Sequence, residues 1–240
     1  MKNHKSSEDF IAELNISGKR DVWYQNHPKI NYIFKKTKKY FDPQSSICEI
    51  GLGDGYLLRL IAKLGNPTSG IDISHYLIDK LNKSFAQNDV PIKLYQADIS
   101  KPFEIKEKFD VVYCLDILEH IEGDRIFKAI ENIKHIVNED AILIVSLPWR
   151  ENLTNQMVIC PKCNFEFHRI GHHHSFNNFN EIYKLFGKDF DIIKFGFVPP
   201  SDIPNKLYYL LKKTLLRKYF FLGKYPKFYS SIYLITRAKK

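Results

Sequence analysis

The segment Ile47-Cys48-Glu49-Ile50-Gly51-Leu52-Gly53-Asp54-Gly55 constrains this chain more than any other. A short apolar strand leads into three alternating glycines, and apolar residues at helical spacing follow from Tyr56 to Leu64. Glycine accepts positive φ and lacks a Cβ, so such a turn lets the backbone approach a nucleotide-like ligand. The dinucleotide fingerprint G-x-G-x-x-G would require glycine at Tyr56. An ordinary tight strand-to-helix turn would also explain the glycines.

The rest of the chain alternates between strand and helix patterns. We expect strands at 46–50, 68–73, 92–96, 109–115, 141–147, 190–198 and 231–236. We expect helices at 28–41, 54–64, 74–86, 124–137 and 177–186, the first beginning near Pro28. Several strands are apolar throughout, which predicts an α/β fold with a parallel sheet covered on both faces.

Length and composition predict one main domain. Residues 1–20 are expected to form an arm and residues 21–240 the domain, with a polar Cys/His loop at 149–175 and a basic, aromatic, mainly helical insertion at 199–229. No uncharged apolar run approaches the ~18 residues of a membrane span, and the start of the chain has no apolar leader. These features favour a cytoplasmic protein whose four cysteines are free thiols or metal ligands.

Acidic residues follow the first four expected strands. Glu49 precedes the glycines, Asp72 and Asp98 close the second and third strands, and Leu115-Asp116-Ile117-Leu118-Glu119-His120 follows the fourth. Each acid alone could simply cap the next helix. The carboxyl ends of parallel strands meet at one edge, where open α/β sheets bind ligands. Four such positions in register therefore predict a binding site.

These segments together resemble the class I S-adenosylmethionine-dependent methyltransferases, specifically the ubiquinone/menaquinone-biosynthesis type (methyltransferase type 11 or 23). The resemblance covers residues 21–198 and rests on ICEIGLGDGYLL, GIDIS, YQADIS and FDVVYCLDILEHI. It implies a doubly wound, Rossmann-like sheet of seven strands whose last strand is antiparallel. The helical insertion expected at 199–229 precedes that strand. The resemblance also implies S-adenosyl-L-methionine as cofactor.

The resemblance assigns cofactor roles to the first motif. Gly51, Gly53 and Gly55 would pass beneath the methionine part of the cofactor, and Glu49 would face its amino group. Glu replaces the family's usual Asp at 49. Asp54 replaces a Thr and adds a charge near a helix N-terminus, where an acid is favourable.

The later motifs would hold the nucleoside. Asp72 would bind the ribose hydroxyls, and Ile73 would pack on the adenine. Asp98 would accept a hydrogen bond from the adenine amine, assisted by the backbone of Ile99. The carbonyl of Leu115 would meet the cofactor's ammonium group.

Two histidines are candidate catalytic groups. Methyl transfer from a sulfonium needs alignment and desolvation, and an oxygen or nitrogen acceptor can also need a base. His120 lies after the fourth strand, although Leu118-Glu119-His120 could instead cap a helix or shape the pocket. His172 is the histidine of a Gly-His-x-x-x-Phe pattern that faces substrate in the resembled family.

The loop at 149–175 also has zinc-site spacing. Cys160-Pro-Lys-Cys163 is followed by His168 and His172, so these four residues are candidate zinc ligands. Redox thiols and plain loop residues are the alternatives. Zinc binding and base catalysis compete for His172. Cys48 and Cys114 are expected to be buried small residues in neighbouring strands.

The sequence favours a methyltransferase acting on a small molecule, at an oxygen of a sugar, a lipid-linked or a phosphorylated metabolite. The net charge of +9 resides in the tail, where residues 205–240 hold ten Lys/Arg and no acid. That tail could contact an anionic membrane, or simply be a solvated surface.

A non-catalytic cofactor-binding protein and an RNA methyltransferase are the alternative functions. No Asn/Asp-Pro-Pro-Tyr element or RNA-binding module is present, which disfavours nucleic acid. Tyr56 disfavours a nicotinamide dehydrogenase.

Overall fold

The computed structural model describes residues 9, 13, 22–88, 90–102, 104–198 and 231–240. The predicted arm at 1–20, except Asp9 and Glu13, and the predicted insertion at 199–229 lie outside the described residues. Within the described part of the chain, no helix has both the length and the apolar character needed to cross a membrane.

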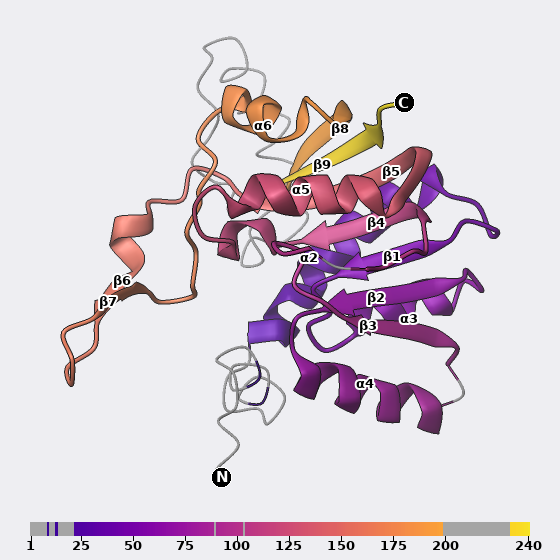
Figure 1. Ribbon diagram of the computed structural model, residues 1–240, viewed down its shortest axis with the longest axis horizontal. Helices are drawn as coiled ribbons and strands as arrows, with labels where there is room; N and C mark the ends of the chain where they lie inside the picture. Colours follow the sequence, from indigo (N-terminus) through magenta and orange to yellow (C-terminus); the bar gives the residue numbers. More distant parts are fainter. Residues whose placement is uncertain (1–8, 10–12, 14–21, 89, 103, 199–230) are drawn as a thin grey trace, which may run out of the picture.

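A seven-stranded sheet forms the centre of the molecule (Figure 1). Its strand order is β3-β2-β1-β4-β5-β9-β8, and only β9 runs antiparallel to its neighbours. The strands are β1 (Ile47–Ile50), β2 (Thr68–Asp72), β3 (Ile92–Gln96), β4 (Phe109–Leu115), β5 (Val137–Pro148), β8 (Phe190–Val198) and β9 (Ser231–Ala238). The predicted mostly parallel, seven-stranded Rossmann-like fold with an antiparallel last strand is confirmed.

Helices cover both faces of the sheet. The helices α5 (Arg125–His135) and α6 (Phe179–Phe186) bury their apolar faces against one side. The helices α2 (Val22–Thr37) and α3 (Tyr56–Ala62) cover the other, and α4 (His75–Gln87) packs with α3 beside β2 and β3. Both faces of the sheet are thus shielded from solvent, which explains why the strands are apolar without interruption. Cys48 and Cys114 are fully buried in β1 and β4, as predicted.

The predicted start of the first helix is wrong. Pro28 lies inside α2, which already includes Val22. Proline has a helix-compatible φ, so a helix can continue through it at the cost of one hydrogen bond and of ring crowding against the carbonyl four residues earlier. The helix ends at Thr37, where a 3₁₀ turn (Lys38–Tyr40) leads toward β1.

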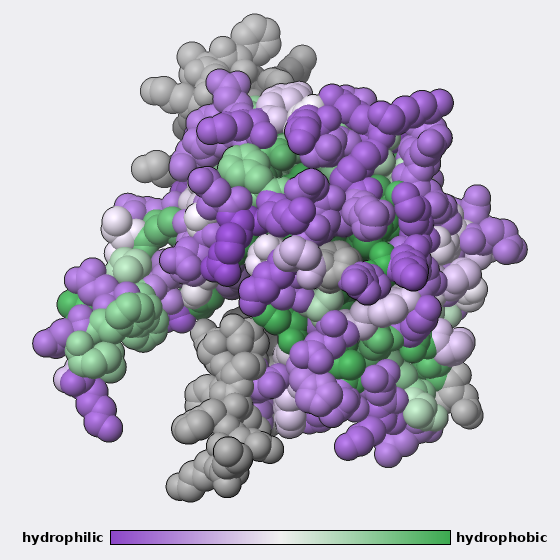
Figure 2. Space-filling view, in the orientation of Figure 1, coloured by the Kyte–Doolittle hydropathy of each residue, from purple (hydrophilic) through white to green (hydrophobic). Residues whose placement is uncertain are grey.

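The segment predicted as a polar loop contains a β-hairpin that projects from the body of the molecule (Figure 1). After a 3₁₀ turn (Leu153–Gln156), β6 (Met157–Ile159) pairs antiparallel with β7 (Glu166–His168). Each strand has only three residues, too few to show a period-two pattern. Apolar side chains gather on this projection (Figure 2), where Met157, Phe165 and Phe167 are all more than 40% exposed.

Asn132 of α5 links the outer helix layer to the loop after β3. Its buried side-chain amide donates to the carbonyls of Ile99 and Lys101, both at 2.8 Å.

We expect Asn132→Leu to lower the free energy of unfolding by about 2 kcal/mol, because two buried carbonyls lose their donor. Urea unfolding would measure this. The control Glu131→Gln, on the exposed side of α5, should change it by less than about 0.5 kcal/mol. Equal effects would contradict the linkage.

Candidate functional site

A cavity of about 2320 Å³ opens at the carboxyl ends of the parallel strands. It extends from the glycine turn after β1 to the inner side of the β6–β7 hairpin, where Phe167 lines it. Ligand pockets commonly measure about 300–1,000 Å³, so this cavity can hold a nucleotide-sized cofactor and a second molecule together. Every strand-end acid that the sequence singled out lines it.

The glycine turn after β1 is held in left-handed backbone conformations. Gly51, Gly53 and Gly55 have φ values of +78°, +52° and +74°. A Cβ on Gly51 would lie 1.9 Å from Cδ1 of Ile117, so a side chain there would force Ile117 to move. The Gly51 N–H donates to the carbonyl of Ile71 at 2.8 Å, which ties the turn to β2.

Asp72 joins the ends of β1 and β2. Its Oδ2 accepts from the N–H of Leu52 at 2.8 Å, and its Oδ1 accepts from the N–H of Ser74 at 2.9 Å. Burial raises the pKa of Asp72, and these backbone donors partly offset the rise. The Ser74 hydroxyl caps α4 by accepting from the N–H of Leu77, and it also donates to Asp9 at 2.6 Å. A carboxylate held by the backbone from both sides is preorganised for a further donor, such as a sugar hydroxyl.

Glu49 is buried beneath the turn with an unsatisfied oxygen. Its side chain is 4% exposed, and Oε2 has no hydrogen-bond partner among the described residues. Burial raises its pKa well above the ordinary value, and the charges of Asp54 and Asp72 raise it further. A buried carboxylate oxygen without a partner is costly, so its position beside the cavity suits a cationic ligand.

The remaining predicted cofactor residues line the same cavity. Asp98 accepts from the N–H of Ser100 at 2.9 Å and from its hydroxyl at 2.7 Å. Partial burial opposes ionisation, yet these bonds and the Lys101 ammonium leave the pKa of Asp98 below its usual value. Ile73 is an apolar side chain 42% exposed on the cavity wall. Ile99 and Leu115 complete this part of the lining.

Sequence reasoning missed the contribution of α2. Lys29 donates to Oδ1 of Asp116 at 2.6 Å and to the hydroxyl of Ser231 at 2.7 Å. His27 contacts Asp54 through Nε2 at 2.8 Å and stacks on Tyr56. One lysine among many in α2 carries no local signal, because its role depends on where the helix packs.

The two predicted catalytic histidines come together at the hairpin end of the cavity. The ring centroids of His120 and His172 lie 4.9 Å apart. Nδ1 of His120 lies 3.0 Å from the carbonyl oxygen of Gly171, and Nδ1 of His172 lies 2.6 Å from Oε2 of Glu151. An oxygen acceptor at Nδ1 requires the proton there, which leaves each Nε2 with a free lone pair. Glu151 was not singled out by the sequence.

Glu119 anchors this end of the site. It is 1% exposed, and its backbone carbonyl accepts from the N–H of His173 at 2.7 Å. Its Oε1 lies 3.9 Å from Nε2 of His172, and its Oε2 has no partner among the described residues. The strand-end turn after β4 and the segment 171–174 are therefore held against one another.

The structure does not bring the four predicted zinc ligands together. Cys160 and Cys163 lie in the hairpin tip, whereas His168 pairs with Met157 at the other end of the strands. Three strand steps of ~3.3 Å separate the two ends. Neither cysteine belongs to any group of three or more potential ligands among the described residues. Backbone N–H groups of Lys162 and Cys163 lower the pKa of the Cys160 thiol. Zinc at the cysteine pair stays a prediction.

The sequence was compared with known protein families. The family model described as a methyltransferase domain matches residues 47–140, from β1 into β5. Residues 47–140 therefore match a methyltransferase domain, in agreement with the resemblance of the sequence to the class I S-adenosylmethionine-dependent methyltransferases.

Relatives and solved structures agree with this domain. The ubiquinone biosynthesis O-methyltransferase of Rickettsia typhi is 30% identical over 123 residues, covering 50% of this chain and 49% of that protein. The chain thus spans about half the length of the curated relatives it matches. An S-adenosylmethionine-dependent methyltransferase structure from Clostridium acetobutylicum has a TM-score of 0.64 at 14% identity, covering 96% of this chain and 98% of that one.

A Burkholderia thailandensis 1,6-didemethyltoxoflavin-N1-methyltransferase, solved with 1,6-didemethyltoxoflavin and S-adenosylhomocysteine, has a TM-score of 0.66 at 10% identity. That match covers 100% of this chain and 94% of the other. At such identities the likeness establishes the fold of the methyltransferase domain.

Two glycine-to-alanine variants can separate the stability cost of a Cβ clash at Gly51 from the cost of backbone strain. We expect Gly51→Ala to lower the free energy of unfolding by more than Gly65→Ala does. Both glycines have positive φ, but a Cβ at Gly65 meets nothing within 4 Å. Gly65→Ala should therefore cost only the left-handed strain of about 1–2 kcal/mol. Urea unfolding of both variants measures the difference, and equal losses would contradict the tight packing of the turn.

The buried Glu49 of the methyltransferase domain predicts a pH dependence of stability. Its folded pKa is raised well above 4.5. Above pH 4.5 the unfolded chain releases this proton while the folded state retains it, so rising pH destabilises the fold. Glu49→Gln removes this contribution. We expect the stability of Glu49→Gln relative to wild type to increase between pH 5 and pH 8 in urea unfolding. A difference independent of pH would contradict the raised pKa.

Proposed function

We propose that this chain is an S-adenosyl-L-methionine-dependent methyltransferase that methylates an oxygen of a small-molecule acceptor. One observation carries the proposal. A single cavity contains, at one end, a glycine turn above a buried carboxylate with one unpartnered oxygen and, at the other end, two histidines whose Nδ1 atoms are already bonded. The first end suits an amino-acid-bearing nucleoside, and the second suits an acceptor that must lose a proton.

The residues of the first end suit the cofactor. Glu49 would balance its ammonium, and the glycine turn, with its three positive φ values, would carry the backbone beneath its methionine part. Asp72, fixed by two backbone N–H groups, would bind the ribose hydroxyls. Ile73, Asp98 and Ile99 would enclose the adenine, and Leu115 would offer its carbonyl.

The bound cofactor would supply an electrophilic methyl group on a sulfonium. The chain would then hold an acceptor oxygen in line with that group and keep water away. His120 and His172 line the cavity with their Nδ1 atoms already bonded, so each has one lone pair available for the acceptor end. Lys29 neutralises Asp116 at the boundary between the two ends.

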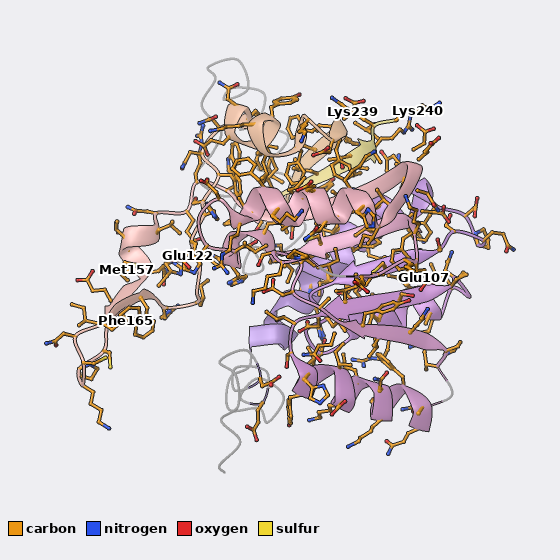
Figure 3. All side chains as sticks on the ribbon, viewed as in Figure 1. Glu107, Glu122, Met157, Phe165, Lys239 and Lys240 are labelled. Atoms are coloured by element: carbon orange, nitrogen blue, oxygen red, sulfur yellow. The ribbon has the colours of Figure 1, made fainter. Side chains whose placement is uncertain are left out.

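The acceptor end favours a molecule with an apolar part. Met157, Phe165 and Phe167 line the cavity from the projecting hairpin, and Figure 3 shows the first two far from the sheet, across from Glu122 on the body. Of the sugar, lipid-linked and phosphorylated acceptors predicted from the sequence, a lipid-linked metabolite agrees best with this apolar wall. The O-methyltransferase name of the Rickettsia relative supports an oxygen acceptor.

Two alternatives receive less support. A non-catalytic cofactor-binding protein would need no acceptor space, whereas this cavity exceeds the size of one ligand. An RNA methyltransferase would draw on the basic tail, most of which lies outside the described residues. The proposal of peripheral membrane contact depends on that same tail.

Cofactor binding provides the test. We expect S-adenosylhomocysteine to bind the full chain in isothermal titration calorimetry, and Asp72→Ala to weaken binding at least ten-fold because the ribose loses its acceptor. The matched control is Asp191→Ala, an exposed aspartate on β8 paired only with Lys239 among the described ion pairs. It should bind like wild type. No binding by wild type, or unchanged binding by Asp72→Ala, would contradict the proposed function.

A further inference from the structure

Three potential metal ligands converge at the acceptor end of the cavity. One ligand atom from each of Glu119, His120 and His172 lies within 4.8 Å of the other two. Glu119 and His120 follow β4, whereas His172 lies 52 residues later along the chain from His120. The fold therefore assembles this group from two separate segments.

The hydrogen bonds around the histidines prepare both rings for coordination. Nδ1 of His120 faces the Gly171 carbonyl, and Nδ1 of His172 faces the Glu151 carboxylate. These partners fix the Nδ1–H tautomer, so Nε2 is the coordinating atom. Metal-ligating histidines usually donate their second N–H to a carbonyl or carboxylate in this way.

A second, independent observation points to a missing cationic partner. Glu119 is 1% exposed, yet its Oε2 has no hydrogen-bond partner among the described residues, while its Oε1 lies 3.9 Å from His172 Nε2. A buried carboxylate oxygen without a donor is costly. A cation held by Glu119 and His172 would remove that cost.

We propose that Glu119, His120 and His172 bind one divalent transition-metal ion, with Glu151 and Gly171 orienting the two imidazoles. Two imidazoles and one carboxylate form a donor set typical of Fe(II), Mn(II), Co(II) and Zn(II), with coordination positions left open. Donors bound to one ion at about 2.1 Å lie about 3–3.5 Å apart. The three ligands therefore need to close by about 1 Å.

The neighbouring group of Glu151, His168 and His172 is less suited to a metal. Nδ1 of His168 accepts the backbone N–H of His172 at 3.0 Å, so the ring proton must reside on Nε2. That nitrogen then has no lone pair for an ion. Glu151 is also already engaged by His172. We therefore assign Glu151 as a positioning residue and not as a ligand.

The role of this metal site in the reaction rests on the proposed methyltransferase function. The ion's open positions would bind the acceptor hydroxyl and lower its pKa. The hydroxyl proton passes to water, the new oxygen–methyl bond forms as the sulfur–methyl bond breaks, and the sulfonium becomes a neutral thioether. The imidazoles then act through the ion and do not themselves take the proton.

Cobalt binding tests the site without requiring the acceptor. Metal-free full-length protein would be dialysed against CoCl₂, with bound cobalt measured by elemental analysis and visible absorption. We expect about one Co²⁺ per chain and no thiolate-to-cobalt charge-transfer band. The dissociation constant should rise at least ten-fold in His120→Asn and in His172→Asn. Glu151→Gln should weaken binding through the loss of orientation, by about ten-fold.

Two control variants define the outcomes. His135→Asn, at an exposed position ending α5, and the double variant Cys160→Ser/Cys163→Ser should bind cobalt like wild type. Loss of cobalt only in the double cysteine variant, a thiolate band in wild type, or unchanged binding by the His120 and His172 variants would overturn the proposal. No specific cobalt binding by wild type would do the same.

The same samples separate this proposal from the proposed function. S-adenosylhomocysteine binding and the urea midpoint would be measured on each variant. Retained S-adenosylhomocysteine binding in His120→Asn and His172→Asn shows that loss of cobalt is not loss of fold. Cofactor binding without cobalt binding rejects the metal site alone. Cobalt binding without cofactor binding rejects the proposed function and leaves the metal site.

Discussion

The carboxylate of Asp72 holds the ends of β1 and β2 in a fixed relation. Its two oxygens accept from the N–H groups of Leu52 and Ser74, so the glycine turn and the start of α4 share one anchor. Parallel strands direct all their carboxyl ends to one edge, which concentrates acids there. The protein stabilises most of these acids locally, with backbone donors at Asp72, with Ser100 and Lys101 at Asp98, and with Lys29 at Asp116.

Two carboxylates at this edge are stabilised less completely. Glu49 and Glu119 are both almost fully buried, and each has one oxygen without a partner among the described residues. They lie under the two parts of the cavity, one beneath the glycine turn and one beside the histidines. We interpret each as the binding group for a cation. The first would receive an ammonium group, and the second would receive a metal ion.

Much of this arrangement could be predicted because it is encoded locally. The glycines at 51, 53 and 55, the acids at strand ends and the Ser74 cap each follow from a few neighbouring residues and the geometry of parallel strands. Their convergence needs only the right-handed alternation of strands and helices. The seven-stranded order confirms this reasoning.

The remaining features depend on tertiary placement. Lys29 and Glu151 have no distinguishing neighbours in the sequence, and each acquires its role only when α2 or the end of β5 packs at the cavity. The hairpin explains why the four predicted zinc ligands do not meet. A short separation in sequence suggested that Cys160, Cys163 and His168 act together, but β6 and β7 direct the cysteines to the tip and His168 to the base. His172 instead joins His120, which is remote in sequence.

The central claim is that Glu49 is kept as a buried acid for the ammonium group of the cofactor. Calorimetric titration of S-adenosylhomocysteine in buffers of different ionisation enthalpy would count the protons exchanged on binding. Because burial raises the pKa of Glu49 and pairing with a cation lowers it again, the account predicts that binding to wild type releases more protons than binding to Glu49→Gln. Equal proton counts for the two proteins, at comparable affinity, would contradict it.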